Sequence, residues 1–205
     1  MSHRLVLGID GSGKSTLLNG LKQRRGIVPL EPTSSPEARE FKARATSLSV
    51  TPELIDEREQ IFLRLNKNFD DQVRGVLGSG EEVATTGNSL VTRVSHALMR
   101  QIVCGFENEV MDAVNIWIDD TSTLKPDSVI LVHAPDKVIR ERIMGRQASG
   151  ATDEKFWGFN SPYFLSRYQE SWLNILNGIL VDSGIGCLTL DSSNLSPEEM
   201  VNSVA

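Results

Sequence analysis

Short apolar segments alternate along the chain with longer amphipathic segments, and this alternation predicts the fold class. The strand-like segments are RLVLG, GIVPLE, EEVATTG, SVILVHA and IGCLTL. Between them, apolar positions at helical spacing predict helices over residues 14–25, 52–77, 89–117, 136–145, 162–181 and 197–205. Strands that alternate with helices form parallel sheets covered on both faces, so we expect an α/β fold.

Composition is typical of one soluble domain, which we expect to span residues 1–205. The chain has 40% hydrophobic and 23% charged residues and a formal net charge of -6. The acidic balance argues against a protein that coats nucleic acid nonspecifically, although a local basic cleft would be compatible with it.

Cysteine usage and hydropathy bear on location. Cys104 and Cys187 match neither a disulfide framework nor a metal-ligand spacing, so we expect both to be reduced. No apolar run approaches the length of a membrane span, and no charged-then-apolar leader precedes the first strand. We expect no membrane partner and a cytoplasmic location, which would be the host cytoplasm if the protein is viral.

The segment GIDGSGKS, residues 8–15, fills the phosphate-binding pattern G-x-x-x-x-G-K-[ST] between a predicted strand and a predicted helix. In this pattern backbone N–H groups and the helix N-terminus surround the phosphates of a nucleoside triphosphate. We expect Lys14 to reach the β and γ oxygens of ATP and Ser15 to bind Mg²⁺. The nucleotide-binding residues predicted in this way are Gly8, Gly11, Ser12, Gly13, Lys14, Ser15 and Thr16.

Asp10 lies within this loop, although nucleotide binding does not require a carboxylate there. On the acceptor side of the γ-phosphate it would orient an attacking hydroxyl or accept its proton. The alternative is a turn-stabilising aspartate.

Four segments resemble those of thymidylate kinases: GIDGSGKSTLL, LEPTSSPEAR, KPDSVILVHAPDKVIRERIMGR and LTLDSSNLSPEEMV. The first is typical of P-loop proteins in general, whereas the other three together point to this family. The resemblance implies a doubly wound five-stranded parallel sheet, ATP as the donor, a nucleotide-sized acceptor and a homodimer. It also implies that Glu31 and Pro32 border the acceptor base and that an arginine follows them, here Arg39 or Arg44.

The middle of the chain departs from that family. Thymidylate kinases carry a phenylalanine that stacks on thymine, an arginine one turn later that holds the acceptor phosphate, and an Asp-Arg pair after the third strand. Phe62 matches the first, but Asn66 replaces the arginine and Thr86-Gly87 replace the pair. Because each charge-assisted bond contributes about 1.5–3 kcal/mol, we expect dTMP to bind poorly unless other residues compensate.

Two explanations of this departure remain open. In the first explanation, other cations replace the missing phosphate-binding arginines. After a local shift of register this would be Arg64 or Lys67. Otherwise one basic face towards the acceptor would be formed by Arg93, His96 and Arg100, unless that face is simply solvated. Alternatively, the acceptor is a modified pyrimidine whose own hydroxyl is phosphorylated, such as 5-hydroxymethyluracil. Thymidylate-kinase-like enzymes of bacterial viruses act in this way on bases within DNA.

Residues 145–162 are polar and glycine-bearing, and they form a candidate lid. Arg142 and Arg146 precede it and match the lid arginines of the resembled family. Since the P-loop has Ser12 in place of a basic residue, we expect these two arginines to stabilise the transferring phosphoryl group.

Together these features predict a Mg²⁺-ATP-dependent kinase with Asp10, Lys14, Arg142 and Arg146 as catalytic residues. Residues expected to bind the pyrimidine acceptor are Glu31, Pro32, Arg39, Phe62, Thr86, Arg93 and His96. We favour a hydroxylated pyrimidine, as a nucleotide or in DNA. The alternatives are a divergent dTMP kinase that makes dTDP and a non-catalytic nucleotide-binding protein.

Overall fold

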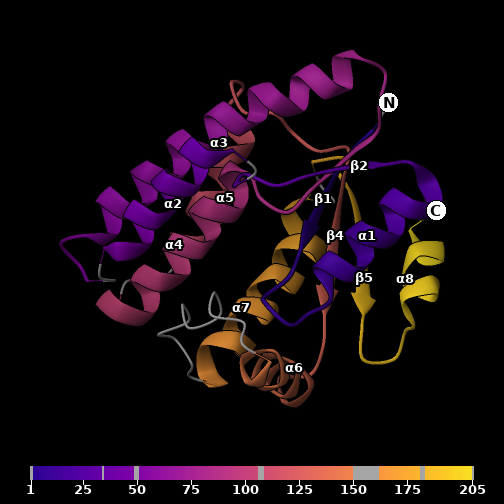
Figure 1. Cartoon of the computed structure of the whole chain (residues 1–205). Helices are drawn as coiled ribbons and strands as arrows, with labels where there is room; N and C mark the ends of the chain where they lie inside the picture. The colour runs from indigo at the N-terminus through magenta and orange to yellow at the C-terminus, as the bar shows by residue number, and fades with distance from the viewer. Residues whose placement is uncertain are drawn as a thin grey trace.

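A five-stranded parallel sheet with helices on both faces forms the centre of the molecule (Figure 1). The computed structural model describes residues 2–33, 35–48, 51–105, 109–149, 162–180 and 183–204. The strands are β1 (His3–Leu7), β2 (Val28–Leu30), β3 (Val83–Thr85), β4 (Ser128–His133) and β5 (Gly186–Asp191), in the order β2-β3-β1-β4-β5. The predicted doubly wound α/β fold is confirmed.

The central strand β1 pairs in parallel with β3 on one side and β4 on the other. In this register Leu5 lies opposite both Thr85 and Val129. The carboxyl ends of parallel strands meet at one edge of the sheet, where open α/β folds bind ligands. The segments that follow β1 and β3 therefore begin side by side at that edge.

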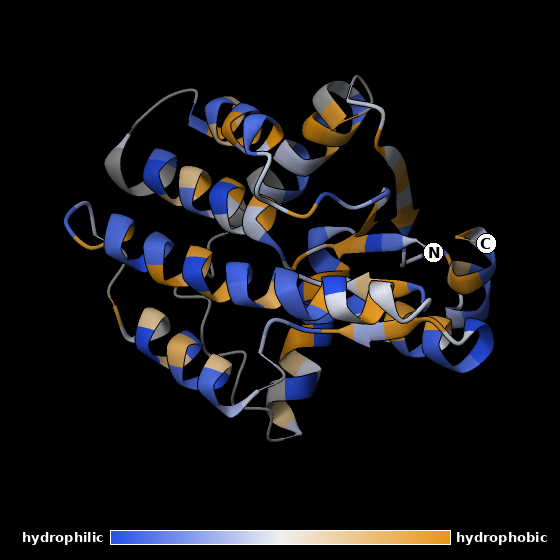
Figure 2. Cartoon of the chain, turned by 90° about the horizontal axis from the view of Figure 1, so that it is seen from above, coloured by the Kyte–Doolittle hydropathy of each residue, from blue (hydrophilic) through white to orange (hydrophobic). Residues whose placement is uncertain are grey.

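Each face of the sheet has its own hydrophobic core, because successive strand residues point to opposite faces. Leu5 and Leu7 pack in the core beneath α4 (Ser89–Cys104), α5 (Glu109–Asp119) and α7 (Pro162–Ile175). Val6 packs in the core beneath α1 (Lys14–Arg25) and α8 (Pro197–Ser203). Figure 2 shows the hydrophobic strands between these helix layers.

The longest helix, α3 (Ile55–Gly78), packs along α4 and carries α2 (Pro36–Ser47) on its other side. Near its end, Phe69 and Val73 form a third small core with Val83 of β3. Helix α6 (Asp136–Ala148) follows β4, and a π-helical turn (Leu176–Leu180) follows α7. Figure 1 shows α2, α3, α4 and α5 gathered on one side of the molecule, with α1 and α8 on the other.

Several predicted helix boundaries were wrong. The predicted helix over 89–117 is two helices, because Gly105 adopts a left-handed conformation (φ 73°) and its N–H donates to the carbonyl of Gln101. Helix α2 was not predicted, although Ser35 caps it and Pro36 begins it. Cys187 is a free thiol, and the side chain of Cys104 lies outside the described residues. Within the described ranges, no helix has the length and apolar character of a membrane span.

Gly20 provides a test of the packing between α1 and α8. A Cβ at Gly20 would overlap the side chain of Val201, which is buried, whereas a Cβ at Gly75 of α3 would meet nothing within 4 Å. We expect Gly20→Ala to lower the free energy of unfolding by about 1–3 kcal/mol because it overpacks this contact. Gly75→Ala should raise it by about 0.5–1 kcal/mol, since alanine favours a helix over glycine. Urea unfolding followed by circular dichroism measures both, and stabilisation by both variants would contradict the contact.

Candidate active site

Strand β1 leads directly into the P-loop, residues 8–13, and α1 begins at the next residue, Lys14. Gly8 has φ 143°, and a Cβ there would overlap the carbonyl of Val132 and the Ser12 hydroxyl, so only glycine fits. Gly13 caps α1 with φ 103° and has no side chain to cover the first N–H groups of the helix. This helix end can therefore receive an anion.

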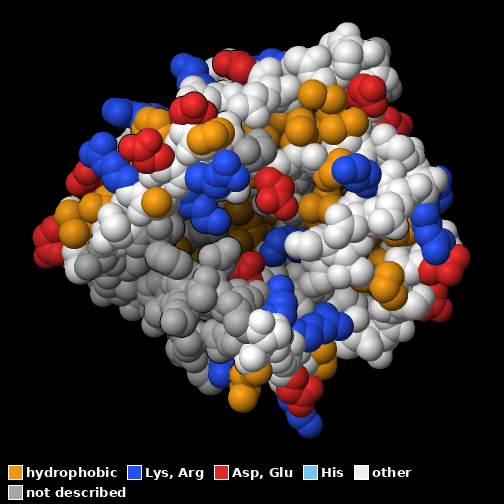
Figure 3. Space-filling view, in the orientation of Figure 1, with side chains coloured by type: hydrophobic (Ala, Val, Ile, Leu, Met, Phe, Trp, Pro, Cys, Tyr) orange, Lys and Arg blue, Asp and Glu red, His pale blue; other side chains and the backbone are white. Residues whose placement is uncertain are grey.

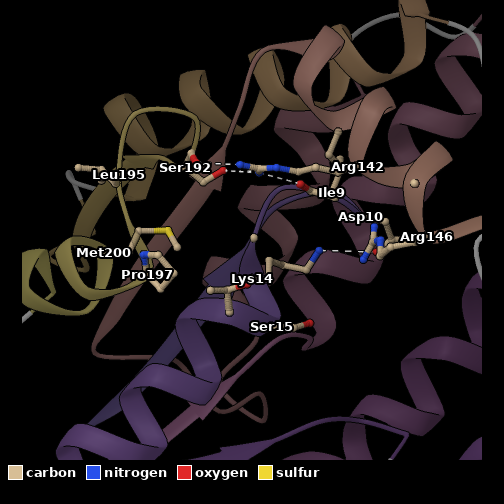
Figure 4. A pocket seen from close by; sticks show the side chains of 14 residues that line it. Ile9, Asp10, Lys14, Ser15, Arg142, Arg146, Ser192, Leu195, Pro197 and Met200 are labelled. Carbon is tan, nitrogen blue, oxygen red and sulfur yellow. Dashed lines mark hydrogen bonds and ion pairs between the residues drawn. The ribbon is translucent and has the colours of Figure 1, made fainter. Parts of the chain in front are cut away.

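Lys14 lies across the loop. Its Nζ donates to the carbonyl of Gly8 at 2.6 Å and lies 3.8 Å from Oδ1 of Asp10 (Figure 4). Burial lowers the pKa of Lys14, and the nearby carboxylate of Asp10 opposes that shift. The side chain is only 17% exposed, so its charge is little screened by water.

Ser12 does not face the nucleotide side of the loop. Its side chain is fully buried, and its backbone N–H donates to the carbonyl of Ile9 at 3.1 Å. Ser12 therefore stabilises the shape of the loop, and its role in nucleotide binding stays a prediction.

A cavity of about 460 Å³ opens beside the P-loop, and we call it the donor cavity. Its lining residues are Ile9, Asp10, Gly11, Gly13, Lys14, Ser15, Thr16, Arg142, Gly145, Arg146, Ser192, Leu195, Pro197 and Met200. The P-loop and α6 make its polar end, and Leu195, Pro197 and Met200 make an apolar end (Figure 4). Such a cavity offers one end to phosphates and another to a flat apolar group.

The two arginines of α6 differ in their surroundings. Arg142 donates from Nη1 to the carbonyl of Gly11 at 3.0 Å and to the Ser192 hydroxyl at 2.8 Å. Its Nη2 donates to the carbonyl of Ser192 at 2.9 Å. Arg142 thus ties the P-loop to the segment after β5 (Figure 4). Arg146 lies one turn later and close enough for its charge to contribute to the lowered pKa of Lys14.

The candidate lid, residues 145–162, lies largely outside the described residues, which omit 150–161. The lid therefore stays a prediction. Both arginines assigned to it come from α6 itself, which extends to Ala148.

A second cavity, of about 320 Å³, adjoins the donor cavity, and we call it the acceptor cavity. Its lining residues are Asp10, Lys14, Ser15, Glu31, Pro32, Thr33, Lys42, Phe62, Leu65, Asn66, Thr86, Gly87, Asn88, Val91 and Thr92. Asp10, Lys14 and Ser15 belong to both cavities. Figure 3 shows a hollow in the face that it presents, with Lys and Arg as well as Asp and Glu side chains around it.

Among the residues predicted to bind the acceptor, Glu31, Pro32, Phe62 and Thr86 line this cavity. Arg39 does not line it: it is exposed on α2, while Lys42, three residues later, does. Their roles stay predictions. Lys42 was not predicted, because the resembled family has an arginine in this segment.

The predicted basic face of α4 does not form at either cavity. His96 is 3% exposed, and its Nδ1 bonds to the carbonyl of Thr92 at 2.8 Å. Burial is the largest of the effects that lower the pKa of His96 to about 4, so this ring is neutral at pH 7. Arg100 instead bonds to the carboxylates of Asp56 and Glu59.

Arg93 also lies elsewhere. It lines neither cavity, and its charge contributes to the lowered pKa of Lys125, which places it near the segment before β4. Arg93 thus lies outside the acceptor cavity, and its role in acceptor binding stays an untested prediction.

Two positions that carry arginines in thymidylate kinases are occupied differently. Asn66 donates from Nδ2 to the Thr92 hydroxyl at 2.6 Å and is buried. A Cβ at Gly87 would lie 2.8 Å from Cγ of Pro32, so this close approach leaves no room for a larger residue. These neighbours explain why neutral and small residues stand at both positions.

The charged groups of the described acceptor lining balance, with two of each sign. Of the described lining residues, Asp10 and Glu31 are anionic, Lys14 and Lys42 are cationic, and none is an arginine. In the described ranges no group of three or more His, Cys, Asp or Glu side chains is arranged to hold a metal ion. The metal-binding group that the P-loop offers is the Ser15 hydroxyl, which lines both cavities beside Lys14.

Comparison with solved structures identifies the fold. Deoxyadenosine kinase from M. mycoides with bound dATP matches with a TM-score of 0.69 and 12% identity, over 100% of this chain and 97% of that chain. Thymidylate kinase from Candida albicans matches with a TM-score of 0.66 and 14% identity, over 99% of this chain and 88% of that chain. A sugar kinase from Janibacter sp. HTCC2649 matches with a TM-score of 0.52 and 17% identity, over 100% of this chain and 92% of that chain. No protein-family model matches the chain, and no curated protein does.

These likenesses confirm the predicted thymidylate-kinase-like P-loop kinase fold. At such identities they show the fold alone, so the reaction must be argued from this chain's own residues.

Substitutions of the two arginines of α6 should differ in their effect on the free energy of unfolding. We expect Arg142→Met to lower the free energy of unfolding by about 1–3 kcal/mol, because three bonds that join two segments are lost. Arg146→Met, at an exposed position of the same helix, should change it by less than about 0.5 kcal/mol. Urea unfolding without nucleotide measures both values, and equal losses would contradict the clamp assigned to Arg142.

Proposed function

We propose that this protein is a Mg²⁺-ATP-dependent kinase that transfers the γ-phosphoryl group to a pyrimidine nucleotide acceptor. The observation that carries the proposal is that the donor and acceptor cavities share Asp10, Lys14 and Ser15. Phosphoryl transfer requires donor and acceptor to meet in line at one point, and these three residues mark that point.

On the donor side, the backbone N–H groups of the P-loop and the start of α1 would hold the phosphates of ATP. Lys14 would neutralise charge on the β and γ oxygens, and Ser15 would bind the Mg²⁺ that accompanies ATP. When bound, Mg²⁺ lowers the negative charge that an attacking oxygen meets. Arg146, which lines the same cavity, supplies a further positive charge towards the transferring group.

On the acceptor side, Asp10 is placed to receive a proton. The acceptor hydroxyl oxygen forms a bond to the γ-phosphorus while the bond from that phosphorus to the bridging oxygen of ADP breaks. The hydroxyl proton passes to the Asp10 carboxylate, which lines both cavities. A carboxylate at this point can accept the proton of a neutral hydroxyl, whereas a fully ionised phosphate has no such proton to give.

The lining of the acceptor cavity supports a hydroxylated pyrimidine such as 5-hydroxymethyluracil, free or in DNA. Phe62 offers a ring against which a flat base can stack. Neutral groups of Asn66 and Thr92 stand on the same wall, and Gly87 packs against Pro32 where a phosphate-binding arginine would otherwise stand. The described lining contains no arginine, so it lacks the guanidinium groups that hold a dianionic phosphate in a bidentate manner.

A panel of acceptors tests this proposal. We expect ADP release from Mg²⁺-ATP in the presence of 5-hydroxymethyl-dUMP, or of DNA that contains 5-hydroxymethyluracil, at a rate at least tenfold above that with dTMP or dUMP. Mass spectrometry of the product should place the new phosphate on the base hydroxyl. Lys14→Met should lower the rate by about 10²–10³-fold, because it removes the charge that stabilises the transferring group.

The other outcomes decide between the alternatives. Faster turnover of dTMP with formation of dTDP would identify a divergent dTMP kinase and overturn the hydroxyl acceptor. ATP binding without acceptor-dependent ADP release across the whole panel would identify a non-catalytic nucleotide-binding protein. An unchanged rate in Lys14→Met would contradict the P-loop mechanism itself.

Lys42 and Arg39 of α2 form a matched pair for a second prediction. Because Lys42 lines the acceptor cavity and Arg39 does not, we expect Lys42 to contact the 5′-phosphate of a nucleotide acceptor. Lys42→Met should raise the KM for 5-hydroxymethyl-dUMP about fivefold, as a partly exposed charge pair contributes up to about 1 kcal/mol. The KM for the corresponding nucleoside, which lacks the phosphate, should not change, and Arg39→Met should affect neither. A larger effect at Arg39 would reverse the assignment.

A further inference from the structure

Arg58 is a buried arginine behind the acceptor cavity. It lies on α3 one turn before Phe62 and is 8% exposed. In the part of the chain that the structure describes, it forms no ion pair with a carboxylate. Burying a charge without a carboxylate partner costs free energy of folding, so we expect the contacts of Arg58 to serve a specific structural role.

The guanidinium of Arg58 contacts two different elements. Its Nη1 donates to the carbonyl of Ala45 at 3.0 Å and to that of Leu48 at 3.2 Å, at the end of α2. Its Cζ lies 5.6 Å from the centre of the Phe62 ring. The last carbonyls of a helix have no partners within that helix, and a cation can both bond to them and stack on an aromatic ring.

These two elements both contribute to the acceptor lining. Phe62 lines the cavity from α3, and Lys42 lines it from α2. Arg58 itself lines neither cavity. It contacts the ring of Phe62 and the end of α2, the helix that carries Lys42. One side chain therefore fixes the relative placement of both.

His96 completes the support behind the ring. Its ring centre lies 5.7 Å from that of Phe62, and its Nδ1 bonds to the carbonyl of Thr92, a residue of the cavity wall. Because His96 is neutral at pH 7, it adds no second positive charge beside Arg58. Phe62 is thus held by Arg58 and His96, both outside the cavity.

We propose that Arg58 is a positioning residue for the acceptor, which acts by holding Phe62 and the end of α2 in the geometry that receives the base. This inference rests on the proposed kinase function. A preformed wall lowers the entropy that the protein loses when the acceptor binds, so loss of Arg58 should weaken acceptor binding and leave ATP binding unchanged.

The test compares three full-length variants. Arg58→Met removes the charge and both hydrogen bonds while it keeps most of the volume. Arg58→Lys keeps the charge but lacks the planar fork that stacks and bonds at once. Arg74→Met is the matched control, because Arg74 of α3 also donates to a backbone carbonyl, that of Ser122, but lies away from both cavities.

We expect Arg58→Met to raise the KM of the acceptor about tenfold, with the KM of ATP changed by less than twofold. Arg58→Lys should recover part of this loss, and Arg74→Met should leave both constants unchanged. An acceptor KM that does not change in Arg58→Met overturns the proposal. An equal rise in both KM values also overturns it, because it would show a general loss of structure.

A second measurement needs no turnover. With 4-fluorophenylalanine in place of Phe62, the ¹⁹F resonance should be single and sharp in the wild-type protein and shifted or broadened in Arg58→Met. An unchanged resonance in Arg58→Met would overturn the inference that Arg58 orders the Phe62 ring. If the wild-type protein transfers phosphate to no acceptor, the proposed function fails, and the ¹⁹F signal still decides separately whether Arg58 orders Phe62.

Discussion

The parallel pairing of β1 with β3 and β4 is the constraint on which the site depends. It places the P-loop after β1 beside residues 86–88 after β3, although about 75 residues separate them in sequence. The close approach of Gly8 to Val132, the last but one residue of β4, fixes the loop against the other neighbour of β1. Donor and acceptor cavities therefore meet at Asp10, Lys14 and Ser15 because the sheet order brings their walls together.

Charge distinguishes the two cavities that this sheet order creates. The donor cavity combines helix N–H groups with Lys14 and Arg146, which suits several phosphates. In the acceptor cavity, the bond between Asn66 and Thr92 and the contact between Gly87 and Pro32 occupy the places where arginines would hold a phosphate. The same fold can thus serve a charged or a neutral acceptor group, because the choice rests on a few residues in the middle of α3 and directly after β3 and not on the sheet.

Sequence patterns predicted the features that depend on local chemistry. The five strands and α1 follow from short-range periodicity, and the P-loop follows from eight consecutive residues. Helix α2 was missed because its apolar positions are few: among its side chains that the structure describes, those of Ala38 and Ala45 are buried, and Phe41 is exposed. The role of Arg100 was also missed, because its partners Asp56 and Glu59 lie more than 40 residues away in the sequence. Lys42 and Arg58 matter through the packing of α2 on α3, which no local pattern specifies.

The separation of roles between Arg142 and Arg146 follows from the same distinction between local pattern and tertiary contact. Both arginines match a lid motif by spacing, yet the structure commits both terminal nitrogens of Arg142 to Gly11 and Ser192. Moving Arg142 to a transferring phosphate would break three hydrogen bonds and leave a carbonyl of the P-loop without its partner. Arg146 is exposed, and its charge contributes to the lowered pKa of Lys14. Under the proposed function, the contacts of each guanidinium, more than its place in the motif, therefore distinguish a structural part for Arg142 from a charge-supplying part for Arg146.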